Sequence, residues 1–310
     1  MNSSTSLFTS LPVGIGTWSW GDRLVWGFGT TYHKEDLRKA FKYCVENGVC
    51  FFDTAEVYGQ GKSELLLGEF IQEVGRPVSI GTKYMPYPWR IGRRSLHKAL
   101  NASLKRLQQK QVDLYQIHIP LPPVNIDRWM EAMAGAVQLG YIRWVGVSNF
   151  NLAQTQRAYD ALKREGITLA SNQVEYHLLD RRIEKNGLLD LCRELGVTVI
   201  AYSPLAMGVL TGKYHYGYSL KGFRATRYNR QYLERIQPLI QTMKKIGALH
   251  QKTISQVAIN WTICKGTYPI PGVKNLEQAQ QVVGSVGWTL TEEEVYELDK
   301  LSNQVTKQGQ

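Results

Sequence analysis

The chain has 310 residues, of which 43% are hydrophobic and 20% charged, and its formal net charge is +11. Its four cysteines include no Cys-x-x-Cys pair, so neither a disulfide framework nor a zinc cluster is indicated. No apolar run approaches the roughly 20 residues of a membrane span, and residues 1–6 lack the basic start and apolar stretch of a secretory signal. We therefore expect a cytoplasmic protein with no membrane partner and no metal.

The positive net charge admits nucleic acid or anionic ligands as partners. Basic residues gather in two places, the first being Arg90, Arg93 and Arg94, and the second Lys213, Lys221, Arg224, Arg227 and Arg230. Solvated surface is the default interpretation of both, although the second lies where a phosphate site is expected. No nucleic-acid-binding motif is present. We expect no nucleic-acid partner, and the oligomeric state stays open.

Apolar runs typical of buried strands alternate with segments of helical periodicity along the whole chain. The predicted strands are residues 11–17, 49–52, 78–82, 112–117, 142–147, 170–174, 197–201 and 268–270. The predicted helices are residues 34–47, 62–73, 95–107, 127–139, 152–164, 186–195, 232–250, 255–264, 276–283 and 291–301. Ser95 is the expected N-cap of the third helix.

Eight βα units without an intervening linker predict one α/β domain over residues 1–310. The expected fold is a closed (β/α)₈ TIM barrel with C-terminal helices. The alternative is an open Rossmann sheet. It is less favoured because Gly14-Ile15-Gly16-Thr17 lacks the third glycine of the dinucleotide fingerprint and no helix follows it directly.

Polar, titratable side chains follow three consecutive predicted strands. Asp53 and Tyr58 come after the second strand, Lys83 after the third and His118 after the fourth. Taken singly, each has an ordinary structural role, as a packing tyrosine, a capping aspartate, a solvated lysine or a buried polar histidine. In a closed parallel barrel, however, these strand ends meet on the face that carries active sites. The four residues together therefore predict a catalytic site.

This set of side chains suits the protonation of an oxygen that gains negative charge. Tyr58 is the natural proton donor, but a free tyrosine has a pKa near 10. An ammonium from Lys83 would lower that pKa, and the Asp53 carboxylate would keep the lysine protonated. His118 would hydrogen-bond a carbonyl oxygen at the same point. The chemistry that fits is reduction of a C=O group by hydride.

The sequence resembles the aldo-keto reductase family in three ordered motifs. They are Phe52-Asp53-Thr54-Ala55-x-x-Tyr58-Gly59, the segment GYIRWVGVSNF at 140–150, and Ile270-Pro271-Gly272-Val273-Lys274-Asn275. With Lys83 and His118, the resemblance covers about residues 14–301. It implies a barrel that binds NADP(H), with Tyr58 as general acid. Residues 16–21 and 24–27 further resemble plant plastid and cyanobacterial members, including those that reduce pyridoxal.

The resemblance also implies which residues bind the cofactor. Ser148, Asn149 and Gln173 would hold the nicotinamide carboxamide, and Tyr202 would stack on the ring. The expected phosphate and adenosine contacts are Ser203, Pro204, Leu205, Gly208 and Lys213 at the pyrophosphate, Lys274 and Asn275 at the 2′-phosphate, and Gln278 and Gln281 at the adenosine. The other expected cofactor contacts are Gly16, Thr17, Trp18, Asp53, Pro271 and Gly272.

We expect an NADPH-dependent reductase of small carbonyl substrates, with Trp18, Tyr58, Trp89 and His118 forming the substrate pocket. The aromatic loops after the first and third strands would make a flat slot for planar aromatic aldehydes such as pyridoxal. These aromatics could instead pack only on each other. A second function stays open, because potassium-channel β-subunits share this barrel and act chiefly as partners. The alternative is an NADP(H)-binding regulatory barrel.

Overall fold

The protein forms a barrel of eight parallel strands that pair in sequence order. This is seen in a computed structural model that describes residues 7–8, 11–122, 125–214, 218, 220 and 222–307. Residues 1–6 and Lys221 lie outside the described residues. The strands are β1 (Ile15–Gly16), β2 (Phe51–Asp53), β3 (Ser79–Tyr84), β4 (Val112–Ile117), β5 (Ile142–Ser148), β6 (Leu169–Glu175), β7 (Thr198–Tyr202) and β8 (Tyr268–Ile270).

The barrel closes between its first and last strands. Gly16 forms a parallel bridge with Gly272, and the amides of Gly14 and Gly16 donate to the carbonyls of Pro269 and Pro271 at 3.0 Å. The two prolines have no N–H to return, so this ladder is one-sided. That explains why β1 is only two residues long where a strand over 11–17 was expected. The closure confirms the predicted (β/α)₈ barrel.

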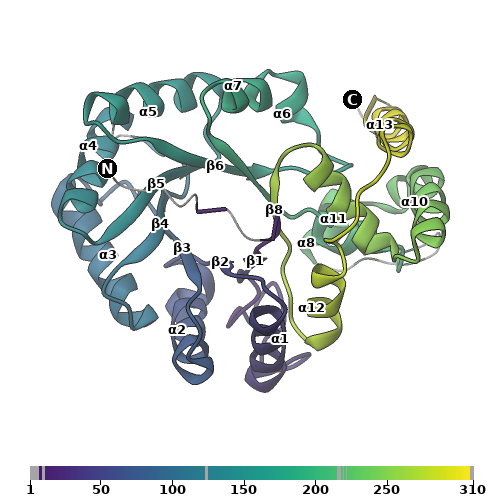
Figure 1. Cartoon of the computed structure of the whole chain (residues 1–310), viewed down its shortest axis with the longest axis horizontal. Helices are drawn as coiled ribbons and strands as arrows, with labels where there is room; N and C mark the ends of the chain where they lie inside the picture. Colours follow the sequence, from purple (N-terminus) through teal and green to yellow (C-terminus); the bar gives the residue numbers. More distant parts are fainter. Residues whose placement is uncertain are drawn as a thin grey trace.

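Helices surround the strands (Figure 1). They are α1 (Lys34–Glu46), α2 (Lys62–Val74), α3 (Arg93–Leu107), α4 (Ile126–Gln138), α5 (Leu152–Arg164), α6 (Arg182–Lys185), α7 (Leu188–Glu194), α8 (Phe223–Arg227), α9 (Arg230–Arg235), α10 (Gln237–His250), α11 (Ile254–Cys264), α12 (Leu276–Val283) and α13 (Glu292–Lys307), with short 3₁₀ turns η1 (Tyr58–Gly61) and η2 (Ala206–Thr211). None of the helices in the described part of the chain is both long and apolar enough to cross a membrane.

Three predicted helix boundaries were wrong. Ser95 does not cap α3: the helix starts two residues earlier, after Gly92 with φ +84°, and the Ser95 hydroxyl donates to the Gly92 carbonyl at 2.8 Å. The helix expected over 186–195 is α7, which begins only at Leu188 because Gly187 at φ +79° precedes it, and the separate short helix α6 was not expected. The helix expected over 232–250 is interrupted at Ile236, just before a proline in the first turn of α10.

Side chains of the strands alternate between the barrel interior and the helices. Phe51 and Leu114 belong to a small cluster with Ile200, Tyr268 and Ile270, whereas Phe52 and Tyr115 belong to the larger cluster shared with the helices. The residue that follows each pair, Asp53 on β2 and Gln116 on β4, returns to the interior by the same alternation. Polar side chains are thereby placed inside the barrel at the carboxyl ends of its strands.

Candidate active site

A buried ion pair lies at the carboxyl ends of β2 and β3. Lys83 and Asp53 are 0% and 1% exposed, and the Lys83 Nζ donates to Asp53 Oδ1 and to the Thr54 carbonyl, the latter at 2.8 Å. The second carboxylate oxygen of Asp53 accepts from Gln173 Nε2 at 2.8 Å and from Gln116 Nε2 at 3.1 Å. Both oxygens of this buried carboxylate therefore have donors.

Tyr58 is brought to this pair by the turn η1. The Lys83 Nζ donates to the Tyr58 hydroxyl at 3.2 Å and lies 4.8 Å from the centre of its ring. The turn packs closely on the loop after β1: a Cβ on Gly59 would stand 2.9 Å from the Gly21 backbone, and Gly59 has a φ of +54°. Only glycine fits this approach without strain. The motif that ends in Tyr58-Gly59 therefore supplies both the tyrosine and the glycine that the turn requires.

The pKa of Tyr58 shifts in the direction opposite to the one expected from the sequence. Burial raises the pKa of Tyr58 above its ordinary value, and the Lys83 charge lowers it by less than burial raises it. Burial also raises the pKa of Asp53 against the opposing effects of Lys83 and the two amides. Burial alone would lower the pKa of Lys83, but Asp53 and Tyr58 raise it further. Lys83 therefore stays protonated and Tyr58 keeps its O–H at neutral pH.

His118 follows β4 and faces Tyr58 edge-on, with ring centres 5.7 Å apart at 84°. Its Nδ1 is buried and has no hydrogen-bond partner among the described residues. Burial, assisted by the charge of Lys83, lowers the pKa of His118 to about 3. The imidazole is therefore neutral at physiological pH, and it can act on a ligand as a hydrogen-bonding group but not as a cation.

A cavity of about 530 Å³ opens beside Tyr58 and His118. Most of the residues predicted for the site line it: Gly16, Trp18, Asp53, Ser148, Asn149, Gln173, Tyr202, Ser203, Pro204, Leu205, Gly208, Lys213, Pro271, Gly272, Lys274, Gln278 and Gln281. Lys83 lies behind Tyr58. Thr17 is fully buried, where its hydroxyl donates to the Asp53 carbonyl at 2.9 Å. Asn275 caps α12 by accepting from the Gln278 amide at 2.9 Å.

Trp89, expected as a wall of the substrate pocket, does not line the cavity. Its side chain is 74% exposed and stacks on Tyr87, with ring centres 4.8 Å apart. The loop is turned outward because Glu56 accepts from both the Met85 amide and the Arg90 guanidinium. The aromatic neighbour of Trp18 in the cavity is instead Trp26, at 5.3 Å and 86°.

One end of the cavity presents amide and hydroxyl groups beside His118. The Tyr202 hydroxyl donates to Asn149 Oδ1 at 3.0 Å, and Asn149 Nδ2 donates to the His118 carbonyl at 3.1 Å. Ser148 donates to the Gln173 carbonyl at 2.9 Å. Asn149 has a φ of +61°, a strained conformation for a residue with a side chain. These hydrogen bonds hold polar groups in place along one wall of the cavity that Tyr58 also lines.

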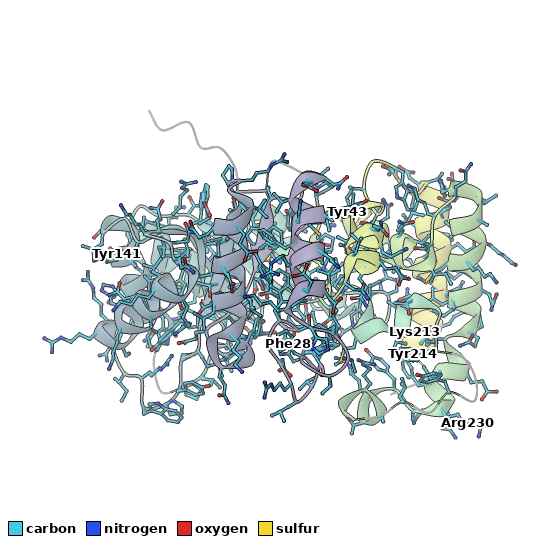
Figure 2. The ribbon with its side chains drawn as sticks, turned by 90° about the horizontal axis from the view of Figure 1, so that it is seen from below. Phe28, Tyr43, Tyr141, Lys213, Tyr214 and Arg230 are labelled. Carbon is cyan, nitrogen blue, oxygen red and sulfur yellow. The ribbon has the colours of Figure 1, made fainter. Side chains whose placement is uncertain are left out.

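The other end of the cavity is cationic. Lys213, Arg224 and Lys274 line it, and none of them forms an ion pair with a carboxylate within the described ranges. Burial, together with the charges of Arg224 and Lys213, lowers the pKa of Lys274 to about 8 against the opposing effect of Asp22. Figure 2 shows Lys213 on the same side of the barrel as Phe28 of the loop after β1. Like charges gathered without an ion-paired carboxylate mark an anion site.

Sequence reasoning missed several cavity residues, of which two have a clear role. Trp26 lies under both cations, with Lys274 Nζ 4.5 Å and the Arg224 guanidinium 5.5 Å from its ring. Arg224 donates to the Tyr214 hydroxyl at 2.7 Å. Both residues were visible in the sequence, as part of an aromatic loop and of the second basic concentration. Ser19, Val57, Ser255 and Ile259 were missed as well, whereas Met207, Thr211, Ile270 and Val282 lie within or beside the segments expected to hold the cofactor.

This chain is similar in sequence to known reductases and similar in fold to solved structures of such enzymes. The chloroplastic pyridoxal reductase of Arabidopsis thaliana is 39% identical over 309 residues, covering 96% of this chain and 84% of that protein. An aldo/keto reductase from Klebsiella pneumoniae, solved in complex with NADP and acetate, is 27% identical with a TM-score of 0.75, covering 94% and 91% of the two chains. A glycerol dehydrogenase from Gluconobacter oxydans has a TM-score of 0.82 at 25% identity, covering 95% and 92%.

The match at the level of the family covers almost the whole molecule. The family model described as "Aldo/keto reductase family" matches residues 12–303, which include all eight strands and the buried Asp53–Lys83 pair. This chain belongs to the aldo/keto reductase family.

Proposed function

We propose that the protein reduces aldehydes and ketones to alcohols with NADPH. The observation that carries the proposal is the contact of 3.2 Å between Lys83 Nζ and the Tyr58 hydroxyl, backed by buried Asp53, at the edge of the cavity. Such an arrangement places an acid beside a fixed positive charge that stabilises the acid's conjugate base. An enzyme that protonates a reduced carbonyl oxygen needs both.

The cavity fits a nicotinamide dinucleotide phosphate in its charge and its backbone shape. Burial and the charges of Arg224 and Lys213 lower the pKa of Lys274 against the opposing effect of Asp22, and a bound 2′-phosphate would supply further negative charge. Backbone at positive φ in Ser203, Ala206, Met207 and Gly208 lets peptide groups curve around a bound pyrophosphate. Lys213 and Arg224 would add charge there, and Gln278 and Gln281 would meet the adenosine. Ser148, Asn149, Gln173 and Tyr202 would hold the nicotinamide.

The bound nicotinamide would supply the hydride, and the protein's own residues would manage the proton. A carbonyl oxygen placed between Tyr58 and neutral His118 would accept hydrogen bonds from both. As that oxygen gains negative charge, the Tyr58 O–H transfers its proton, and Lys83 stabilises the phenolate that remains. Asp53, held by Gln116 and Gln173, keeps Lys83 protonated and aimed.

The test is steady-state NADPH oxidation by the purified chain with a panel of carbonyl compounds. The panel compares carbonyl compounds that carry an aromatic ring with compounds that do not. It contains pyridoxal, aromatic aldehydes, short aliphatic aldehydes and methylglyoxal. We expect turnover with at least one class, with stoichiometric alcohol formation. Tight NADPH binding without turnover on the whole panel would instead support the regulatory barrel.

Cofactor choice should depend on Lys274. A charge-assisted contact contributes roughly 1.5–3 kcal/mol, so NADPH should bind at least about tenfold more tightly than NADH, each tenfold step being about 1.4 kcal/mol. Lys274→Met should remove most of this preference by weakening NADPH binding alone. Titration of both cofactors by fluorescence measures it. Lys42→Met, on the outer face of α1, is the control; equal affinity of the unmodified protein for both cofactors contradicts the assignment.

Substrate preference should depend on Trp18, which lines the cavity at 6.3 Å from the Tyr58 ring and at 33° to it. A planar ring stacked on this indole gains roughly 0.5–1.5 kcal/mol beyond burial of its area. We therefore propose that aromatic aldehydes, pyridoxal among them, are better substrates than short aliphatic ones. Trp18→Ala should raise KM mainly for the aromatic class, whereas Trp89→Ala should change neither class. A uniform effect of Trp18→Ala on both classes would count against the stacking role.

We also propose that the chain is one domain located in the cytoplasm, with a small carbonyl compound as its partner and without nucleic acid. The continuous barrel supports one domain. Four cysteines without a disulfide are consistent with a reducing compartment.

A further inference from the structure

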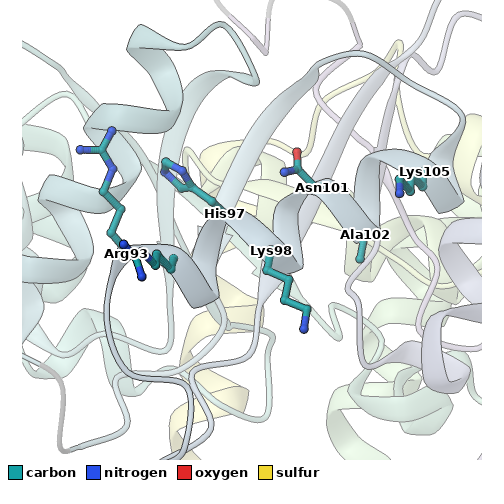
Figure 3. Close-up of a pocket in the computed structure, with 7 residues that line it drawn as sticks. Arg93, His97, Lys98, Asn101, Ala102 and Lys105 are labelled. Atoms are coloured by element: carbon teal, nitrogen blue, oxygen red, sulfur yellow. The ribbon is translucent and has the colours of Figure 1, made fainter.

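The outer face of α3 carries a row of cations. Arg93, Arg94, Lys98 and Lys105, with His97 and Asn101, line an open hollow of about 730 Å³ along the helix, and no carboxylate of the described residues lines it (Figure 3). Arg94 and Lys105 are eleven residues apart, so the row extends for about 16 Å at 1.5 Å per residue. This face is remote from the cavity beside Tyr58 and shares no lining residue with it.

These charges are not compensated within the described part of the chain. None of the four forms an ion pair there, whereas the next cations along the same segment do: Arg90 pairs with Glu56 and Arg106 with Glu64. The adjacent helix α4 adds one exposed base, Arg128, and one exposed acid, Glu131, which cancel. The cations of the row are therefore available to an external anionic partner.

Their position is also unfavourable for the helix itself. Arg93 and Arg94 occupy the first turn of α3, which holds no acidic residue. The positive end of the helix dipole lies there, so cations at this point destabilise the helix. Helix stability does not account for the placement, which favours a role in binding.

Two large apolar side chains stand exposed just before the row. Trp89 is 74% and Ile91 66% exposed. Trp89 is held in place by stacking on Tyr87 at 3°, and the Arg90 guanidinium lies 5.2 Å from the Tyr87 ring. An exposed tryptophan and isoleucine on a braced loop mark an interaction surface.

We propose that Trp89, Ile91 and the cations of α3 form a docking surface for an anionic lipid bilayer. The row complements a surface of negative head groups, and a tryptophan beside an aliphatic residue is suited to the boundary between head groups and acyl chains. Ile91 favours lipid over nucleic acid, because an aliphatic side chain gains nothing from phosphates and stacks poorly on bases. This proposal departs from the sequence expectation of no membrane partner. That expectation rested on the lack of a long apolar run, and peripheral docking does not need one.

Sedimentation with lipid vesicles tests the proposal on the full chain. We expect binding to phosphatidylcholine vesicles that contain phosphatidylglycerol, weakened by salt, and little binding to phosphatidylcholine alone. Arg94→Glu with Lys98→Glu should lower the partition coefficient by at least roughly 30-fold, from the usual contribution of a basic residue at an anionic surface. Trp89→Ser with Ile91→Ser should lower it by at least about tenfold.

Matched variants separate this surface from general effects of charge and exposed apolar groups. Lys244→Glu with Lys245→Glu changes the net charge equally on α10, across the barrel from α3 (Figure 1), and Leu249→Ser removes an exposed apolar residue from α10. Both should leave binding unchanged, and all variants should keep NADPH-dependent turnover of a soluble aldehyde where the unmodified chain shows it, with far-ultraviolet circular dichroism as the folding check.

Three results would overturn the proposal. One is equal partition onto neutral and anionic vesicles, and another is an equal loss of binding in the α10 controls. The third is tight, salt-dependent binding to duplex DNA that is lost in the Arg94 and Lys98 variant while vesicles do not bind; this would assign the surface to nucleic acid. The proposal does not depend on the reductase activity, and each can fail alone.

Discussion

Tyr58→Phe should lower turnover by at least the roughly 10²–10⁴-fold that a positioned acid contributes. The substitution removes the hydroxyl 3.2 Å from Lys83 Nζ and keeps the ring that faces His118 and Trp18. The cavity walls are unchanged, so NADPH should bind with nearly its original affinity. Single-turnover kinetics with saturating NADPH, together with a cofactor titration, measure the two effects separately.

Tyr87→Phe is the matched control, because Tyr87 stacks on Trp89 outside the cavity and its hydroxyl has no part in the site. It should leave turnover unchanged. Near-normal turnover of Tyr58→Phe would assign proton donation to another group. His118 would be the next candidate by position, although its pKa of about 3 leaves it without a second proton at neutral pH.

Lys83→Met should abolish most of the activity and also destabilise the fold. The methionine fills much of the same space, but Asp53 is left buried without its ammonium partner. Breaking a buried ion pair by removing one partner costs about 3–5 kcal/mol. Gln116 and Gln173 still donate to Asp53, so we expect the lower part of that range in the free energy of unfolding. Denaturant unfolding followed by circular dichroism measures it.

The double variant Lys83→Met with Asp53→Asn separates the two consequences. Removing the stranded charge should restore part of the lost stability, because the buried site is then neutral. Activity should stay as low as in the single variant, since no ammonium faces Tyr58. A double variant less stable than Lys83→Met alone would mean that the cost arises from packing and not from the unpaired carboxylate.

The fold and the reactive centre were predictable because they follow from local patterns. Apolar runs at regular intervals with helical spacers specify a parallel barrel, and the closure between β1 and β8 confirms it. Strand alternation then directs Asp53 and Lys83 inward at the ends of their strands. The structure places these predicted residues next to each other, and their catalytic roles stay predictions.

Loop placement was not predictable, because a loop is positioned by contacts with distant segments. Trp18 and Trp89 are both aromatic residues that follow a strand, yet only Trp18 lines the cavity. The ion pair of Arg90 with Glu56, 34 residues apart, turns Trp89 to the surface. Arg224 reaches the cavity through the long connection after β7. No local pattern encodes either outcome.

The sequence by itself therefore determined the barrel, the identity of Asp53, Tyr58, Lys83 and His118 and the chemistry that they suit, since periodicity and residue type act within a strand or a turn. The tertiary structure alone decided the upward direction of the Tyr58 pKa, the two amides from Gln116 and Gln173 on Asp53, and the gathering of Lys213, Arg224 and Lys274. Burial and the distance between charges set these properties. Both depend on segments that are far apart in the chain and meet only when it folds.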